Sequence, residues 1–219
     1  MLITFEGIEG SGKSTQAKRL ITWFENHDIP SVLTREPGGT EIGKQIRQIL
    51  LNPDHTTICP MTELLLYMAD RSQHLTELIR PELDSGKIIL CDRFFDATTV
   101  YQGIARQVDS HLIQQLHNIV LSGLKPHKTF LFDLPVHEGL ARAWKRITAN
   151  QKEQAENRFE KESIDFHEQV RQGYLELAKQ DSDRFVVIDA SLSMDDIFDI
   201  VVGCIESILG RISSFGETI

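Results

Sequence analysis

The chain has 219 residues, a length that suits one large domain or two small ones. Its hydrophobic fraction of 41 % is enough for a core, and its net charge of −9 disfavours broad electrostatic binding to nucleic acid or to an anionic membrane. The three cysteines are scattered, match no zinc spacing and predict no disulfide framework, which favours a reducing cytoplasm.

Short apolar stretches alternate with longer periodic ones along the chain. The short stretches predict strands over residues 2–6, 31–35, 87–92, 128–133 and 185–189. Most are almost continuously apolar, which is typical of parallel strands buried on both faces. The periodic stretches predict helices over residues 13–27, 40–51, 60–85, 109–121, 135–146, 163–181 and 194–209. This alternation predicts an α/β fold with three α/β/α layers around a five-stranded parallel sheet.

Two stretches do not fit a packed core. Residues 146–160 are polar without apolar periodicity, and we expect a flexible lid there; residues 211–219 are expected to be a frayed tail. Neither stretch makes a domain boundary, so we expect a single domain over 1–219. The first residues run directly into a predicted strand and no apolar run reaches 18 residues, so we expect no signal peptide and no membrane span.

The predicted strands end on charged residues, and ligands of parallel α/β sheets bind beyond these ends. The ends carry Glu6, Arg35, Asp92 followed by Arg93, Asp133 and Asp189. All but Asp189, which is placed to cap the next segment, are candidates for a site.

The stretch GIEGSGKST, residues 7–15, lies between the first predicted strand and the first predicted helix. Its spacing matches a phosphate-binding loop, in which glycines let backbone N–H groups approach phosphate. Lys13 is expected to reach the β- and γ-phosphates of ATP, and the Ser14 hydroxyl to bind Mg²⁺. The structural alternative is a glycine-rich turn that fits the pattern by chance. The predicted ATP contacts are Gly7, Ile8, Glu9, Gly10, Ser11, Gly12, Lys13, Ser14 and Thr15.

The class of nucleotide protein follows from what accompanies this loop. The guanine-reading tetrapeptide Asn-Lys-x-Asp is missing from the sequence, which disfavours a GTPase. The strand IILCD ends in Asp92, followed by Arg93. Asp92 is placed to hold Mg²⁺ and Arg93 to hold a phosphate, a pairing common in nucleotide kinases. The alternative is a surface salt link at a strand end.

Further candidates suit an acceptor nucleotide. Arg35 ends the second predicted strand, before a tight turn, and Arg71 falls on the apolar face of the helix predicted over 60–85. A buried guanidinium is costly unless it is paired or binds a ligand. Tyr67 lies one helical turn before Arg71, so that a ring and a guanidinium share a face and together suit a base. The alternative is a buried Arg–carboxylate pair beside a core tyrosine.

These residues belong to longer motifs. They are GIEGSGKST, TREPGGT at 34–40, LLLYMADR at 64–71, DRFFDATTVYQG at 92–103, LKP at 124–126 and VRQGYLELA at 170–178. With them the chain resembles the bacterial thymidylate kinase family over about residues 1–205. The resemblance implies the P-loop kinase fold and phosphorylation of dTMP by ATP with Mg²⁺.

The resemblance also implies roles for individual residues. Glu9 matches an acidic residue near the acceptor sugar and Mg²⁺. Arg35 and Arg93 match ligands of the acceptor phosphate, Tyr67 the ring that stacks on thymine, and Arg71 the group that hydrogen-bonds its edge.

Further matches complete the expected dTMP pocket. Tyr101 matches the ring under the deoxyribose and Gln102 lines that side, while Tyr174 matches a tyrosine that closes over the acceptor. The resemblance implies a cis Glu36–Pro37 bond with Pro37 against dTMP. It also implies a homodimer.

The chain departs from the family at residue 97, where Ala97 replaces a frequent serine, so base recognition is expected to rely on Thr98 and Arg71. Family members without a basic residue in the phosphate loop take a cation from the lid, and position 10 is glycine. The candidates are Arg142, Arg146 and Arg158, of which Arg146 is the first choice; its structural alternative is a helix cap. Two rival functions stay open: another nucleoside monophosphate or deoxynucleoside kinase, and a P-loop switch that binds ATP without transfer.

Overall fold

The computed structural model describes residues 1–149 and 155–215, with side chains described up to residue 210. Its centre is a sheet made of β1 (Leu2–Glu6), β2 (Ser31–Arg35), β3 (Ile88–Asp92), β4 (Lys128–Asp133) and β5 (Phe185–Asp189). The strand order is β2-β3-β1-β4-β5, and all neighbours are parallel. The predicted five-stranded parallel sheet is therefore confirmed.

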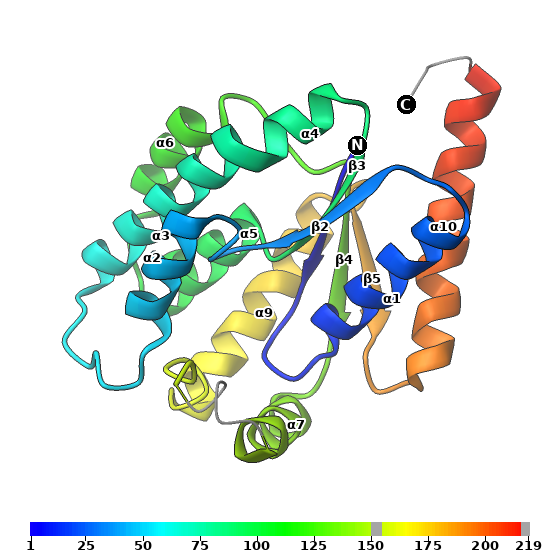
Figure 1. Ribbon diagram of the computed structural model, residues 1–219. Helices are drawn as coiled ribbons and strands as arrows, with labels where there is room; N and C mark the ends of the chain where they lie inside the picture. Colours follow the sequence, from blue (N-terminus) through cyan, green and yellow to red (C-terminus); the bar gives the residue numbers. More distant parts are fainter. Residues whose placement is uncertain (150–154, 216–219) are drawn as a thin grey trace.

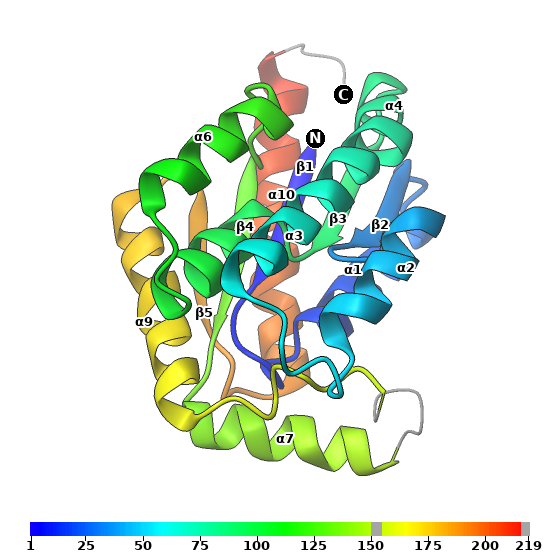
Figure 2. The same ribbon diagram turned by 90° about the vertical axis from the view of Figure 1, so that its left-hand side faces the viewer.

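Helices cover both faces of this sheet, so that the molecule has three layers (Figures 1 and 2). On one face α1 (Lys13–Asn26) packs against α10 (Met194–Phe215). The other face carries helices that lie between β2 and β5 in the sequence: α3 (Pro60–His74), α4 (Arg80–Asp84), α5 (Phe95–Thr98), α6 (Ser110–Leu121) and α9 (Ile164–Gln180). In addition, α2 (Glu41–Leu51) packs on α3, and α7 (Val136–Ala149) lies beyond the carboxyl ends of the strands.

The helix predicted over residues 60–85 is interrupted. After α3, residues Leu75–Ile79 form a π-helical turn, η1, and α4 follows. Pro81 has no N–H to donate to the carbonyl four residues earlier, which disturbs the hydrogen-bond ladder at this point. The apolar face continues through the interruption, because Leu75 and Ile79 are both buried.

A helical segment between β3 and α6 escaped sequence prediction. It comprises α5 and a π-helical turn, η2 (Thr99–Ala105). The consecutive β-branched residues at 98–100 have low helix propensity, so the local sequence does not predict a helix there. Packing supplies the missing stabilisation, because Val100 and Tyr101 are buried and η2 lies against α9.

Two predicted helix ends are wrong. α7 continues past Arg146 to Ala149, because Ile147 extends the buried stripe of Gly139 and Ala143 by one more turn. α10 continues past Leu209 to Phe215. The central part of the predicted lid, residues 150–154, and the last residues of the predicted tail, 216–219, lie outside the described residues. Within the described chain, we find no helix with the length and apolar character needed to cross a membrane.

Candidate active site

The loop between β1 and α1 has the context predicted for a phosphate-binding loop. Gly7, Gly10 and Gly12 take positive φ angles of 136°, 73° and 93°. A Cβ atom at Gly7 would lie 2.4 Å from the carbonyl oxygen of Phe132, so the loop can follow this path only with glycine there. The loop lies between β1 and α1, as the motif requires.

The loop is in backbone contact with α7. A Cβ atom at Gly10 would lie 2.0 Å from the carbonyl oxygen of Gly139, and one at Gly139 would lie 2.6 Å from the carbonyl oxygen of Glu9. Position 10 therefore has no room for a side chain of any kind. The phosphate loop has no second basic residue at position 10, beside Lys13, because α7 approaches the loop too closely there.

Lys13 lies inside the loop and is nearly buried. Its Nζ donates to the carbonyl oxygen of Ile8 at 2.6 Å and to Oγ of Ser11 at 3.3 Å. Burial and the nearby Arg93 guanidinium lower the pKa of Lys13 to about 7. A bound phosphate would favour the charged form again, so this environment suits an anionic ligand.

Two hard oxygen ligands meet at the start of α1. The hydroxyl of Ser14 donates to Oδ2 of Asp92 at the end of β3. Among the described residues no three His, Cys, Asp or Glu side chains gather to hold a metal ion by themselves. Mg²⁺ bound with ATP takes most of its ligands from phosphates and water, and one hydroxyl and one carboxylate from the protein fit that pattern.

Arg93 lies at the centre of a polar cluster. Its backbone takes a positive φ of 70°, which is uncommon for a residue with a side chain. Its Nη2 donates to Oε1 of Glu9 at 2.9 Å, and its Nη1 donates to the Tyr174 hydroxyl at 3.2 Å. The hydroxyl of Tyr101 donates to the same oxygen of Glu9 at 2.7 Å. Burial alone would raise the pKa of Glu9, but Arg93 and His167 lower it below its usual range, so Glu9 is an anion.

Arg71 is buried, with 1 % of its side chain exposed. Its Nε donates to Oε2 of Glu36 at 2.7 Å, and its Nη2 donates to Oγ1 of Thr98 at 3.1 Å. Its buried Nη1 has no hydrogen-bond partner within the described part of the chain. The Arg–carboxylate pair considered from the sequence exists, yet one donor is left for a ligand. Tyr67 lies half-buried on the wall of the same cavity.

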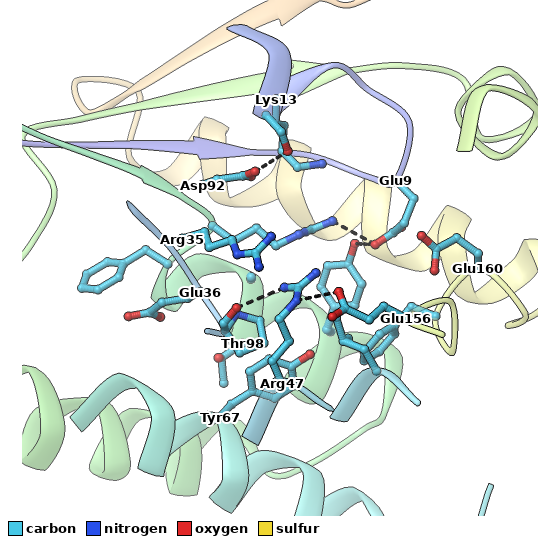
Figure 3. Close-up of a pocket in the computed structure, with 18 of the residues that line it drawn as sticks. Glu9, Lys13, Arg35, Glu36, Arg47, Tyr67, Asp92, Thr98, Glu156 and Glu160 are labelled. Carbon is cyan, nitrogen blue, oxygen red and sulfur yellow. Dashed lines mark hydrogen bonds and ion pairs between the residues drawn. The ribbon is translucent and has the colours of Figure 1, made fainter. Parts of the chain in front are cut away.

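The cavity has a volume of about 420 Å³ and brings most predicted site residues together. In Figure 3, Lys13 and Asp92 lie on one side of it, with Tyr67 and Arg47 opposite and Glu9 and Glu160 at a third side. The predicted residues that line it are Glu9, Gly10, Lys13, Ser14, Thr15, Arg35, Pro37, Tyr67, Arg71, Asp92, Arg93, Thr98, Tyr101, Gln102 and Arg146. The implied Glu36–Pro37 bond is cis.

Other predicted residues lie outside the cavity lining. Four residues of the phosphate loop are not part of the lining: Gly7, Ile8, Ser11 and Gly12. Tyr174 is 1 % exposed; its hydroxyl donates to Oε2 of Glu6 at 2.7 Å and accepts from Nη1 of Arg93 at 3.2 Å. Its closure over an acceptor stays a prediction. Two of the candidates at the strand ends also bond to other parts of the protein. Glu6 accepts from the backbone N–H of Phe94 at 2.7 Å, and Asp133 forms an ion pair with Arg171 at 2.7 Å.

The structure separates the three candidate lid arginines. Arg146 lines the cavity, and its Nη2 lies 3.8 Å from Oε1 of Glu160. Arg158 is nearly buried, and its Nη2 donates to Oε2 of Glu63 at 2.6 Å. Arg142 donates to the carbonyl oxygen of Ala190 at 3.0 Å and is not part of the lining.

Sequence reasoning missed Arg47, which lies on α2 and lines the cavity. Its Nε donates to Oε2 of Glu156 at 2.9 Å, and its Nη1 donates to the carbonyl oxygen of Pro37 at 3.1 Å. In the sequence, Arg47 is one charged residue of a predicted amphipathic helix, and such residues ordinarily face solvent.

A phosphate-binding loop on a five-stranded parallel sheet, facing a cavity lined by arginines and an aromatic ring, defines a P-loop nucleotide kinase. Within this class, the family model described as thymidylate kinase matches residues 5–201. The chain belongs to the thymidylate kinase family.

Individual relatives agree with this assignment. A thymidylate kinase of Desulfosudis oleivorans is 56 % identical over 190 residues, covering 87 % of this chain and 89 % of that protein. A thymidylate kinase of Desulforapulum autotrophicum is 50 % identical over 210 residues, covering 96 % and 92 %. The solved structure of a thymidylate kinase from Ehrlichia chaffeensis is similar with a TM-score of 0.74 at 32 % identity, covering 94 % of this chain and 98 % of that one.

Proposed function

We propose that this protein transfers the γ-phosphoryl group of ATP to dTMP and releases dTDP and ADP, acting as one P-loop kinase domain over residues 1–219. The observation that carries the proposal is the cavity next to the phosphate loop, where Arg35, Arg71 and Arg93 meet the ring of Tyr67. A P-loop switch without an acceptor has no use for such a pocket. The family assignment supports dTMP over other monophosphates.

The two halves of the cavity suit donor and acceptor. The phosphate loop with Lys13 would hold the ATP phosphates. On the other side Arg35 and Arg93 would hold the dTMP phosphate, with Pro37, Tyr101 and Gln102 around the nucleotide. The free Nη1 of Arg71 would hydrogen-bond the thymine edge while the ring of Tyr67 stacks on its face.

In the proposed reaction an oxygen of the dTMP phosphate attacks the γ-phosphorus, and the bond from that phosphorus to the β–γ bridging oxygen breaks. The attacking oxygen is already anionic at neutral pH, so no strong base is required. Catalysis then depends on in-line positioning and on neutralising the charge of the transferred group. Lys13, Arg93 and Arg146 line the cavity and would supply positive charge. Mg²⁺ held by Ser14 and Asp92 would add to it when bound.

Closure of the region around residues 146–160 over the donor would keep water away from the γ-phosphate, so that dTMP rather than solvent is the acceptor. The family resemblance supports a homodimer. The scattered cysteines, which predict no disulfide framework, support a location in the cytoplasm. Size-exclusion chromatography with light scattering would measure the oligomeric state.

The proposal is tested by measuring ADP release with and without dTMP and Mg²⁺, and by identifying dTDP chromatographically. We expect release only when dTMP and Mg²⁺ are both present. Lys13→Met should remove nearly all turnover while calorimetry still detects dTMP binding, because Lys13 serves the donor. ATP binding without dTMP-dependent ADP release would instead support the switch, and turnover like wild type in Lys13→Met would refute the role of Lys13.

A further inference from the structure

His167 lies on the second turn of α9 and is completely buried, with 0 % of its side chain exposed. Its Nε2 lies 3.0 Å from the carbonyl oxygen of Phe159, and its Nδ1 lies 3.2 Å from Oε2 of Glu9. His167 does not line the cavity, but both of its neighbours do. It therefore lies between the phosphate loop and residue 159, near the end of the predicted lid.

Both ring nitrogens of His167 face acceptors. A carbonyl oxygen can only accept, so Nε2 carries a proton. Oε1 of Glu9 already accepts from Tyr101 and Arg93, so the carboxylate is ionised and its Oε2 also faces the imidazole as an acceptor. Nδ1 and this Oε2 have no hydrogen-bond partner within the described residues, and the 3.2 Å between them is an ion-pair distance. The arrangement is satisfied when the ring carries both protons and forms an ion pair with Glu9.

Four residues contact one another in a closed circuit. Glu9 accepts from Tyr101, the ring of Tyr101 packs edge-on against that of Phe159 at 5.4 Å, the Phe159 carbonyl faces His167, and His167 faces Glu9. Glu160, the next residue, lies on the same side of the cavity as Glu9 (Figure 3). A shift of the chain at 159–160 must therefore move His167, Tyr101 or Glu9.

We propose that His167 is a positioning residue that fixes Glu9 at the acceptor side of the cavity and couples it to the chain at Phe159, so that dTMP binding and the position of residues 158–162 depend on each other. This inference rests on the proposed function, because it assigns Glu9 to the dTMP side. His167 touches no substrate and acts through Glu9. Its loss would remove the ion-pair partner of one Glu9 oxygen, and it would leave the Phe159 carbonyl with only the backbone N–H of Glu162, at 3.0 Å.

The test compares His167→Leu, His167→Gln, Glu9→Gln and the Glu9→Gln/His167→Leu double variant by steady-state kinetics. We expect His167→Leu to raise the KM for dTMP about ten-fold, because the ion pair no longer holds Glu9 in position, with the KM for ATP unchanged within about two-fold. His167→Gln, which keeps one donor, should recover part of the loss. The double variant should be no worse than Glu9→Gln alone, because both changes remove the same interaction.

His127→Leu is the matched control, since His127 contacts the backbone of Leu2 at the opposite end of β1 from the site. Hydrogen exchange of the amides at residues 158–162 should be faster in His167→Leu and unchanged in His127→Leu. If His167→Leu does not fold, His167→Gln carries the same comparison. Equal changes in both KM values, or effects of Glu9→Gln and His167→Leu that add, would overturn the inference. An inactive wild type would instead overturn the proposed function.

Discussion

Nη2 of Arg71 donates a hydrogen bond to Oγ1 of Thr98 at 3.1 Å, while Nη1 of the same guanidinium has no partner within the described chain. Thr98 and Glu36 thus hold the guanidinium from two sides and leave one buried donor without a partner within the described residues. An unpartnered buried donor costs free energy unless a ligand satisfies it. The pair identifies the part of the cavity where the base of the acceptor is expected to be recognised.

Thr98→Ala should therefore weaken the preference for dTMP over dCMP. Losing a neutral hydrogen bond that orients Arg71 is worth about 1 kcal/mol, or about five-fold in the ratio of kcat/KM values. Ala97 offers no hydroxyl in its place. Thr99→Ala is the control, because the Thr99 hydroxyl bonds to the carbonyl oxygen of Phe95 and does not line the cavity. An undiminished preference in Thr98→Ala would remove Thr98 from base recognition.

Tyr67→Ala should weaken dTMP binding by about 1–3 kcal/mol, the range found for stacking of a base on an aromatic ring. Tyr67→Phe keeps the ring and should bind dTMP nearly as well as wild type, and ATP affinity should hardly change in either variant. Isothermal titration calorimetry measures both ligands. Unchanged dTMP affinity in Tyr67→Ala would make Tyr67 a residue of the cavity wall with no part in binding.

Arg146→Ala should lower kcat by about 10²-fold or more with the KM for dTMP within a few-fold, as expected for a cation that acts in the transition state. Arg146 lines the cavity, where its Nη2 lies 3.8 Å from Oε1 of Glu160, whereas Arg158 and Arg142 are not part of the lining. Lys145→Ala removes the adjacent, exposed charge and should leave kcat unchanged. If kcat of Arg146→Ala stays near wild type, Arg146 serves the end of α7, where a cation is also favourable. The same assay would then be applied to Arg142→Ala and Arg158→Ala.

Gly139→Ala should disturb the phosphate loop from outside it. The added Cβ atom would lie 2.6 Å from the carbonyl oxygen of Glu9 and 2.8 Å from Cδ1 of Ile8. Overpacking of this kind costs about 1–3 kcal/mol of stability, and the displaced loop should bind ATP more weakly. Gly203→Ala, on α10 with no atom within 4 Å of the added Cβ, should not lower stability. Thermal unfolding and ATP titration check both. Normal ATP affinity in Gly139→Ala would show that the contact does not position the loop.

Much of the fold could be read from the sequence because the parallel strands are buried on both faces and appear as short apolar runs. The phosphate loop could be predicted for a related reason, since its glycines and Lys13 are adjacent in the chain. The segment over 95–105 could not be predicted, because its β-branched residues adopt helical turns only by packing against α9.

The site was less predictable wherever its contacts join distant segments. Arg47 is like any exposed helical arginine until α2 places it beside Glu156. Tyr174 was expected at the acceptor, but its side chain is buried behind Arg93. His167 gave no local signal, since its partner Glu9 lies in the phosphate loop.

The most direct test of the account is a competition in one reaction. The protein is given ATP, Mg²⁺ and an equimolar mixture of dTMP, dUMP, dCMP, dGMP and AMP, and the diphosphates formed are separated and quantified while ADP is measured. The account predicts that dTDP dominates the products and that the amount of dTDP formed equals the amount of ADP formed. Equal amounts of several diphosphates, or ADP release without a new nucleoside diphosphate, would contradict it.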